Sequence, residues 1–476
     1  KRIEEESQKL KELERELKKE IYEKYVRKDE NKKKSQMIAL FEDEDKEYEQ
    51  INLNSSIQMA KILKLDNVSK QTLEKLSEDE AIQKYLNYKK LAKEVSTYSD
   101  EYLKKFNKFG RLTSDYYATM TATGRINSRN PNLQNVPGWF KQMIISEEGF
   151  VPVFIDYSQV ELRILAHLSE DESFIQSAES SDLHSENARK IFDIPSNQPV
   201  PKDLRKKAKT VSFAIPYGTS AYGLFQRGFF DTVEEAQQAI NSFFEAFPRV
   251  RKFLEFNAKR ASEAGFTRDA IGRIRRYEIP KKPQFYDELL DVYKAFSKIS
   301  SELGFTKKIF DMSYEEYSKS PVYNALKLDK ETFIKLKSIA EYNAKLSSIK
   351  REGQNHPIQA TSASITKTAL VRLFEYLRNT GFGVITLSIH DSIFFEIRKD
   401  YLFRAINDIV KIMEDSGKEI IGGRTPVDVE VGRKVNVVCN KCGNNYVDNQ
   451  YYVDLENEVI VNRLEDTSFN VCENCE

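Results

Sequence analysis

The chain has 476 residues, of which 40% are hydrophobic and 31% charged, and its 74 basic residues equal its 74 acidic ones in number. This balance excludes a protein that bulk charge alone holds to polyanions, so a phosphate site requires a local cluster of basic residues. No stretch reaches the roughly 18 consecutive apolar residues of a membrane-spanning helix, and the charged N-terminus lacks the pattern of a secretory signal. The length predicts about three domains.

Regular apolar spacing predicts a helix over residues 1–30 and a helical hairpin from about residue 56 to residue 106. Residues 28–50 are rich in Lys, Glu and Asp, which indicates a solvated helix tip or loop. Between residues 121 and 137, Thr, Gly, Asn and Pro replace the helical pattern and predict an ordered loop.

A strand is predicted from residue 150, where apolar residues alternate with others up to Asp156. Apolar spacing then predicts helices over five segments: 158–170, 202–227, 233–264, 281–350 and 358–379. Two further strands, 383–389 and 393–398, are expected to form a hairpin with residues 390–392 as its turn.

Two aspartates at strand ends, Asp156 and Asp391, are the first candidates for chemistry. Taken singly, Asp156 is explained as a helix N-cap and Asp391 as a turn residue that satisfies its own backbone. Together, two such carboxylates in one sheet can hold two divalent cations ~3.5–4 Å apart, the arrangement of in-line phosphoryl displacement. Mg²⁺ prefers one or two carboxylates, with substrate phosphates and water completing its coordination.

A predicted helix carries Arg205, Lys209, Phe213 and Tyr217 at intervals of four, so these side chains share one face. Two cations followed by two aromatic rings suit a nucleoside triphosphate, with the cations on the phosphates and the rings against base and sugar. The alternative is an amphipathic helix with a solvated basic face. Pro216 is expected to interrupt the helix just before Tyr217.

All four cysteines lie near the C-terminus, as Cys439-x2-Cys442 and Cys472-x2-Cys475. Two such pairs 29 residues apart, with a strand-like segment between them, predict a ribbon in which four thiolates hold one structural Zn²⁺. Redox-active pairs and disulfides are the alternatives.

Six segments, in their order along the chain, resemble the motif series of the family A DNA polymerases, which include bacterial polymerase I and many phage replicases. They are TATGRINSRNPNLQNVP (121–137), DYSQVELRILAHLSED (156–171), DLH (182–184), RKKAKTVSFAIPYG (205–218), NHPIQAT (355–361) and IHDS (389–392). The resemblance begins near residue 50, where INLNSSIQMAKIL is similar to a thumb motif, and extends to about residue 433.

The resemblance implies an α+β right-hand polymerase with an antiparallel palm sheet, a helical thumb and helical fingers, and the zinc ribbon as a small C-terminal addition. The implied domains are the thumb (1–120), the palm (121–200 and 351–436), the fingers (201–350) and the ribbon (437–476). Residues 281–350 form a long helical insertion in the fingers, which either contacts a partner or DNA or is a surface insertion without function.

The implied activity is template-directed extension of a primer 3′ end with dNTPs, by two-metal-ion nucleotidyl transfer with release of pyrophosphate. The implied partners are primer–template DNA, dNTPs, two Mg²⁺ (or Mn²⁺) and a replisome or processivity partner that binds the insertion or the ribbon. No 3′–5′ exonuclease is expected within this chain, so either the enzyme cannot proofread or that domain lies upstream of Lys1. The expected location is the cytoplasm, that of a bacterial host if the protein is phage-encoded.

Site residues are also implied by the resemblance. Asp156, Asp391 and the backbone carbonyl of Tyr157 match metal ligands, and Glu161 matches a steric gate that blocks a ribose 2′-OH and pairs with Tyr217. Nucleotide-binding positions are matched by Tyr157, Gln159, Glu161, His184, Arg205, Lys209, Phe213 and Tyr217. Lys209 is also placed to protonate the leaving pyrophosphate.

DNA-binding positions are matched by Arg125, Asn355, Gln359 and His390 and, in the thumb, by Asn54, Ser55 and Lys93. Arg125, Asn355 and Gln359 would read the minor groove of the nascent pair. The acceptors there are shared by all Watson–Crick pairs, so these contacts test pair geometry without reading sequence. His390 would contact the primer terminus.

One departure concerns the metal site, because Ser392 stands where the family usually has Glu. Two acidic ligands still suffice for a metal pair. A single-subunit RNA polymerase is the nearest alternative, but a steric gate at Glu161 would exclude its substrate. A catalytically inactive DNA-binding relative would have no reason to keep four residues together: Asp156, Asp391, Arg205 and Lys209.

Overall fold

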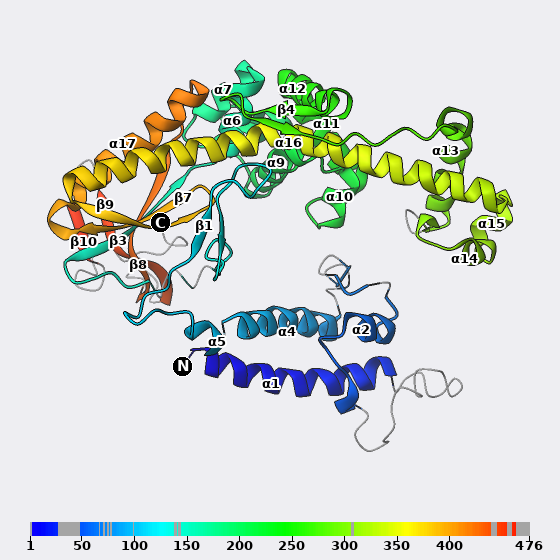
Figure 1. The fold of residues 1–476 in the computed structure, drawn as a ribbon, viewed down its shortest axis with the longest axis horizontal. Coiled ribbons are helices and arrows are strands. Elements are labelled where there is room, and N and C mark those ends of the chain that lie inside the picture. Colours follow the sequence, from blue (N-terminus) through cyan, green and yellow to red (C-terminus); the bar gives the residue numbers. More distant parts are fainter. Residues whose placement is uncertain are drawn as a thin grey trace. The chain divides into compact units, whose positions relative to one another are not determined.

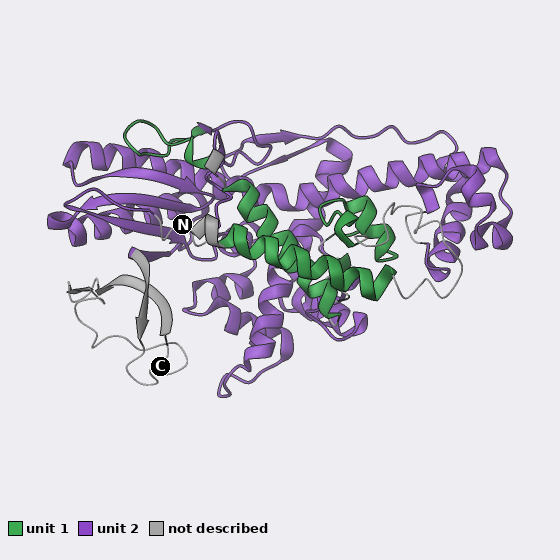
Figure 2. Ribbon diagram, turned by 90° about the horizontal axis from the view of Figure 1, so that it is seen from below, with its two compact units in different colours: residues 1–115 green, residues 116–476 purple. Residues whose placement is uncertain are grey.

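The structure is a computed structural model with two compact units, residues 1–115 and residues 116–476 (Figure 2). It describes residues 2–26, 48–65, 67–69, 72–73, 76, 79–98, 100–137, 140, 144–305, 309–438, 445–454 and 459–462. Among the helices described, none is both long enough and apolar enough to cross a membrane.

The first unit is helical and consists of α1 (Arg2–Ile21), α2 (Ser56–Ile62), α4 (Glu80–Thr97) and α5 (Asp100–Leu103), with a π-helical turn at Tyr22–Val26 (Figure 1). The long helices α1 and α4 pack on each other. Leu17, Ile21, Met59 and Tyr85 are completely or almost completely buried in the core between these helices. The predicted helix over 1–30 is therefore confirmed as far as Val26, and residues 27–47 lie outside the described part of the chain.

The second unit is built on an antiparallel sheet of six strands in the order β10-β9-β8-β3-β7-β6. Its strands are β3 (Phe150–Tyr157), β6 (Gly383–Ile389), β7 (Ser392–Arg398), β8 (Val427–Val438), β9 (Asn445–Asp454) and β10 (Val459–Asn462). The central strand β3 pairs with β7 on one side and β8 on the other. The three strands predicted over 150–156, 383–389 and 393–398 are confirmed, except that Ser392 begins β7 and the turn is shorter than expected.

The C-terminal strands continue the same sheet, since β9 pairs with β8 from Val431↔Tyr451 to Val438↔Asn445. At 12 residues, β8 is longer than the 8-residue β3, so part of it has no β3 residue opposite and pairs with β9 alone. The boundary expected between residues 436 and 437 falls inside β8.

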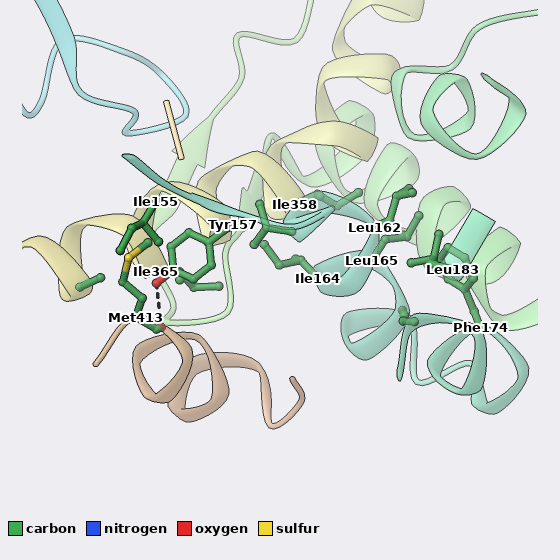
Figure 3. Packing of buried hydrophobic residues seen from close by; sticks show 14 of the residues in the cluster. Ile155, Tyr157, Leu162, Ile164, Leu165, Phe174, Leu183, Ile358, Ile365 and Met413 are labelled. Carbon is green, nitrogen blue, oxygen red and sulfur yellow. Dashed lines mark hydrogen bonds between the residues drawn. The ribbon is translucent and has the colours of Figure 1, made fainter. Parts of the chain in front are cut away.

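Two short two-stranded sheets, β1 (Asp115–Tyr117) with β2 (Asn127–Arg129) and β4 (Phe266–Arg268) with β5 (Ile274–Arg276), accompany the large sheet. The helices between the strands include α6 (Val160–Ser169), α7 (Glu172–Glu179), α8 (Leu183–Phe192), α9 (Lys202–Ala214), α10 (Ala221–Gln226), α11 (Val233–Ala246), α12 (Pro248–Lys259) and α17 (Leu402–Ile421). Alternate residues of β3 (Val153, Ile155 and Tyr157) are buried in the core that these helices cover. The Tyr157 hydroxyl donates to the backbone oxygen of Met413 on α17 at 2.8 Å (Figure 3). Because side chains alternate along a strand, Asp156 lies on the opposite face.

The longest helix, α16 (Lys330–Thr380), has 51 residues and begins far before the predicted start at residue 358. At the end remote from the sheet, its N-terminal half packs with α13 (Tyr286–Glu302) and α14 (Tyr314–Ser318), which in turn contact α15 (Pro321–Leu326) (Figure 1). Phe296, Tyr317 and Phe333 are buried there, and the last two rings stack at 4.4 Å. The insertion at 281–350 is therefore a helical subdomain with its own aromatic core.

Candidate active site

The outer face of the sheet presents Asp156 between two register partners, Ser392 on β7 and Asp428 on β8. The side chain of Asp156 is exposed on this face. The Ser392 hydroxyl donates a hydrogen bond of 2.6 Å to Oδ1 of Asp156. The site therefore has an exposed carboxylate whose rotation is restrained by a neighbouring strand.

Asp391 occupies the tight turn between β6 and β7. Ile389 pairs with Ser392, so only His390 and Asp391 form the turn, and His390 adopts a positive φ of 55°. Burial raises the pKa of the half-buried Asp391; a hydrogen bond from its own backbone N–H and the charge of Arg125 only partly oppose this rise, and the nearby Glu161 adds to it. The turn places Asp391 next to Ser392, the residue that pairs with Asp156 across the two strands.

The oxygen donors at this edge fit a hard divalent cation such as Mg²⁺. They are the carboxylates of Asp156 and Asp391, with the backbone carbonyl of Tyr157 next along β3. In the described part of the chain, no group of three or more His, Cys, Asp or Glu side chains could hold a metal. A cation here would therefore need oxygen ligands from substrate and water to complete its shell.

Glu161 lies at the centre of a polar network at the start of α6. Its Oε1 accepts a hydrogen bond of 2.5 Å from Arg125, and its Oε2 accepts one of 2.9 Å from the Tyr217 hydroxyl. The Gln359 amide donates to the same Tyr217 oxygen at 3.0 Å. Gln159, which precedes α6 with a positive φ of 54°, has a buried Oε1 with no hydrogen-bond partner among the described residues. The structure thus brings four predicted residues into one network, with Gln159 close by in sequence.

Arg125 is presented by a loop that hydrogen bonds hold in place. Arg273 donates to the backbone oxygen of Thr123, and the Thr121 hydroxyl donates to the backbone oxygen of Arg125 at 2.7 Å. Gly124 has a positive φ of 73°, and a Cβ there would overlap the Arg273 guanidinium. Only glycine therefore permits this close approach.

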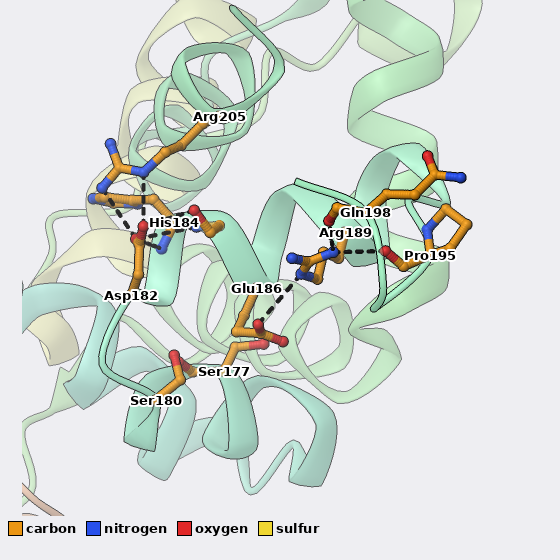
Figure 4. A network of polar contacts seen from close by, with 10 residues as sticks. Ser177, Ser180, Asp182, His184, Glu186, Arg189, Pro195, Gln198 and Arg205 are labelled. Carbon is orange, nitrogen blue, oxygen red and sulfur yellow. Dashed lines mark hydrogen bonds and ion pairs between the residues drawn. The ribbon is translucent and has the colours of Figure 1, made fainter. Parts of the chain in front are cut away.

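The basic face of α9 begins with an ion pair between Arg205 and Asp182 (Figure 4). Arg205 donates to Asp182 from Nε at 2.9 Å and from Nη2 at 3.0 Å. Asp182 also caps α8 by accepting from the backbone N–H groups of His184 and Ser185. Although burial alone would raise it, the Arg205 guanidinium and the Ser185 hydroxyl hold the pKa of Asp182 well below its usual range.

His184 is only 4% exposed, and neither of its ring nitrogens has a hydrogen-bond partner in the described part of the chain. Its ring centroid lies 5.8 Å from that of Phe213. Burial, reinforced by the charges of Lys209 and Arg205, lowers the pKa of His184 to about 4. The imidazole is therefore neutral at pH 7 and has a polar N–H that a ligand could satisfy.

Lys209, Phe213 and Tyr217 line one pocket of about 700 Å³. The helix α9 ends at Ala214, and a 3₁₀ turn (Ile215–Tyr217) follows. Pro216 lacks the N–H that would continue the helix, so the expected interruption before Tyr217 is observed.

A second, smaller pocket of about 240 Å³ is lined by Tyr217, Asn355 and Gln359. Asn355 is 8% exposed, and its Nδ2 has no hydrogen-bond partner among the residues described. Arg275 and Arg351 also line this pocket, where Arg275 forms an ion pair with Glu352. The pocket therefore has hydrogen-bond donors suited to the acceptors of a base pair or to phosphate.

Three predicted thumb residues belong to the first unit. Ser55 caps α2 by accepting from the backbone N–H of Gln58 at 3.3 Å, and Asn54 and Lys93 are exposed. Ser55 therefore has a structural role in its own unit. Cys439, Cys442, Cys472 and Cys475 lie outside the described residues.

Reasoning from sequence missed Asp182 and Arg273, and it treated Ser392 only as a missing carboxylate. Asp182 could have been found from the DLH motif, where it stands two residues before His184. The contacts of Arg273 and Ser392 depend on segments 150 and 236 residues away, and no local pattern reports them.

Comparisons with known proteins were consistent with one another. The family model for DNA polymerase family A matches residues 1–437. The thermostable DNA polymerase I of Thermus aquaticus is 31% identical over 405 residues, which are 80% of this chain and 41% of that polymerase. DNA polymerase I of Borreliella burgdorferi is 38% identical over 248 residues, which are 48% of this chain and 27% of that polymerase. The chain thus spans well under half the length of these relatives.

Among solved structures, the fold is similar to the POL domain of Pol1 from M. smegmatis in complex with DNA primer-template and dNTP. The TM-score is 0.64 at 23% sequence identity, and the match covers 90% of this chain and 65% of that chain. At this sequence identity, the match shows that the two folds are similar.

Proposed function

Because this chain belongs to DNA polymerase family A, we propose that it extends the 3′ end of a DNA primer on a template strand with dNTPs and releases pyrophosphate. The observation that carries the proposal is the pairing of β3 with the β6–β7 hairpin. It sets Asp156 and Asp391 at one edge, within one unit that also carries Glu161 and the basic face of α9.

Two Mg²⁺ or Mn²⁺ ions, held by Asp156, Asp391 and the Tyr157 carbonyl, would supply charge stabilisation at the attacking and leaving oxygens. The protein fixes the carboxylates through the sheet register and half-buries Asp391. Half-burial strengthens the electrostatic interaction of this carboxylate with a cation relative to an exposed one. In the proposed reaction, the primer 3′-hydroxyl would lose its proton to solvent, its oxygen would bond to the α-phosphorus, and the bond from that phosphorus to the pyrophosphate oxygen would break.

The triphosphate would be bound by the cationic face of α9 together with α8. Lys209 is exposed on α9 and lines the large pocket, where its ammonium can donate a proton to the leaving pyrophosphate. His184 is neutral and offers an N–H to a phosphate oxygen. Arg205 is held toward α8 by Asp182 and would extend the positive surface there. Phe213, which also lines the pocket, would face the sugar and base.

Discrimination against ribonucleotides would come from Glu161. Its carboxylate is held on one side by Arg125 and on the other by Tyr217, so it has little freedom to move away from a 2′-OH. Gln359 and Asn355, near the same tyrosine, would test the minor groove of the nascent pair. His390 in the hairpin turn would contact the primer terminus.

The first unit and the insertion fit the thumb and part of the fingers. Asn54, Ser55 and Lys93 would bind the DNA backbone from the thumb, and the helical subdomain at 281–350 would bind DNA or a partner protein. A bacterial or phage origin and a cytoplasmic location stay predictions of the resemblance.

The extension of a primer by the wild-type chain tests the proposal. We expect each dNTP to be added only opposite its complementary template base, and only when Mg²⁺ or Mn²⁺ is present. Addition without a template, or equal use of rNTPs and dNTPs, would contradict the proposal.

We also propose that Cys439, Cys442, Cys472 and Cys475 bind one structural Zn²⁺. Support comes from the strands around them: Val438 pairs with Asn445, so the first cysteine pair belongs to the connection between β8 and β9. In β10, Asn462 pairs with Tyr451, so β10 runs antiparallel to β9. It therefore leads back toward the start of β9, which follows the first cysteine pair in the sequence.

The zinc proposal is tested by metal analysis of the full chain purified without chelator. We expect about one Zn²⁺ per chain, and thiols that react only after the metal is removed. Protein without zinc whose four thiols react freely would contradict it.

A further inference from the structure

The hydroxyl of Ser392 contacts one of the two carboxylates to which we assign the cations. Its bond to Oδ1 of Asp156 is 2.6 Å long, within the range of about 2.5–2.7 Å for a hydroxyl that donates to an ionised carboxylate. Such a bond restricts the rotation of the Asp156 carboxylate about its χ2 bond.

The backbone of Ser392 is held on both sides. It pairs with Ile389 on β6 and with Asp156 on β3, so the hydroxyl is delivered by a rigid three-strand arrangement. Asp391 immediately precedes it in the two-residue turn. One hairpin thus carries one of the two carboxylates and the hydroxyl that orients the other.

The second register neighbour of Asp156 cannot have this role. Asp428 lies opposite Asp156 on β8, and its side chain is a second carboxyl group, not a hydroxyl that always carries a proton to donate. Of the two neighbours across the sheet, Ser392 alone is able to orient Asp156 by donating a hydrogen bond.

We propose that Ser392 is a positioning residue of the cation site, which acts by holding the Asp156 carboxylate in its binding orientation. The inference rests on the proposed function, because it takes Asp156 and Asp391 as ligands. Removing a hydrogen bond that orients a metal ligand typically weakens metal binding about 10–100-fold. We therefore expect Ser392→Ala to weaken cation binding about tenfold.

The test measures Mn²⁺ binding to the full chain by electron paramagnetic resonance, without nucleotide or DNA. Ser392→Ala is expected to raise the Mn²⁺ dissociation constant about tenfold, and Ser392→Thr, which keeps the hydroxyl, to stay within about threefold of wild type. In single-nucleotide insertion, the half-saturating Mg²⁺ concentration should rise in Ser392→Ala, while KM for dNTP at saturating Mg²⁺ is unchanged.

Ser388→Ala is the matched control. Ser388 belongs to the same hairpin, and its buried hydroxyl has no hydrogen-bond partner in the described part of the chain. Its replacement should leave Mn²⁺ affinity within twofold of wild type. Equal losses in Ser388→Ala and Ser392→Ala would overturn the proposal, because they would report a general weakening of the hairpin.

The proposal is also overturned if Ser392→Ala binds Mn²⁺ as wild type does, or if Ser392→Thr binds as weakly as Ser392→Ala with an unchanged melting temperature. Asp156→Asn and Asp391→Asn separate this result from failure of the proposed function. If these two variants still bind Mn²⁺ as wild type does, or if wild type binds none at millimolar concentration, the assigned cation site itself is wrong.

Discussion

The guanidinium of Arg205 and the carboxylate of Asp182 face each other through two hydrogen bonds, 2.9 Å from Nε and 3.0 Å from Nη2. The same carboxylate caps α8 just before His184. One aspartate therefore fixes both the arginine of α9 and the first turn of the helix that carries the histidine.

We predict that Asp182→Ala lowers the free energy of unfolding by about 1 kcal/mol, the usual effect of losing an N-cap. It should also raise KM for dNTP, because Arg205 and His184 lose their common support. Urea unfolding and steady-state insertion kinetics measure the two effects. Ser180→Ala is the control and should leave KM unchanged, because it removes a hydroxyl that donates to the nearby Ser177 carbonyl.

The stability of the second unit should depend on pH through His184 and His356. Burial, as the largest cause, lowers the pKa of each imidazole to about 4 in the folded chain, against about 6.5 in the unfolded chain. Below pH 6.5 the unfolded chain binds more protons than the folded chain. The contribution of each neutral histidine to the free energy of unfolding is therefore fully present above pH 6.5 and decreases as pH falls toward 4. Each histidine should contribute roughly 1–2 kcal/mol of loss between pH 7 and pH 5.

The measurement is the free energy of urea unfolding at pH 7 and pH 5 for wild type, His184→Gln and His356→Gln. Each variant should lose part of the pH dependence. A dependence identical to wild type in both variants would show that other groups take up the protons.

Glu161→Ala should increase the ratio of kcat/KM for a ribonucleotide to that for the matching deoxyribonucleotide by at least tenfold. The side chain is lost from a position where Arg125 and Tyr217 hold it, which leaves room for a 2′-OH. Tyr217→Phe, which removes the hydroxyl but keeps the ring, should change the ratio less. An unchanged ratio in Glu161→Ala would place the discrimination elsewhere.

Gly124→Ala should weaken primer–template binding and destabilise the loop that carries Arg125. The added Cβ would overlap the Arg273 guanidinium, and the φ of 73° is unfavourable for alanine. Gly228→Ala separates the two effects, since Gly228 has a φ of 72° but no described atom within 4 Å of the point where its Cβ would lie. Fluorescence anisotropy with labelled DNA should show a loss for Gly124→Ala alone, and equal losses in both variants would show that backbone strain is the only cause.

Much of the sheet that carries the site was predictable, because a strand with one buried face has apolar residues at every second position. Asp156 was found near the end of β3 in this way, and Asp391 was found in the turn predicted between two further strands. The start of α16 was not predicted, since its N-terminal half packs on an insertion whose partners could not be known from local spacing.

The contacts that set the detailed chemistry of the site were not predictable. The bond between Ser392 and Asp156 follows from the register of two strands 236 residues apart, and a shift of one residue would turn the hydroxyl to the other face. The ion pair between Arg205 and Asp182 likewise joins two helices and depends on how α8 and α9 pack.

Single-nucleotide primer extension by Asp156→Asn and Asp391→Asn, with DNA affinity measured in parallel, is the most direct test of the assigned active site. Both substitutions remove a negative charge with almost no change in side-chain volume, so folding and DNA binding should stay close to those of wild type. We predict that insertion falls at least a hundredfold in each variant while the primer–template dissociation constant changes by less than about threefold. Insertion above a tenth of the wild-type rate in either variant, with DNA binding intact, would contradict the assignment of these carboxylates as metal ligands of a DNA polymerase.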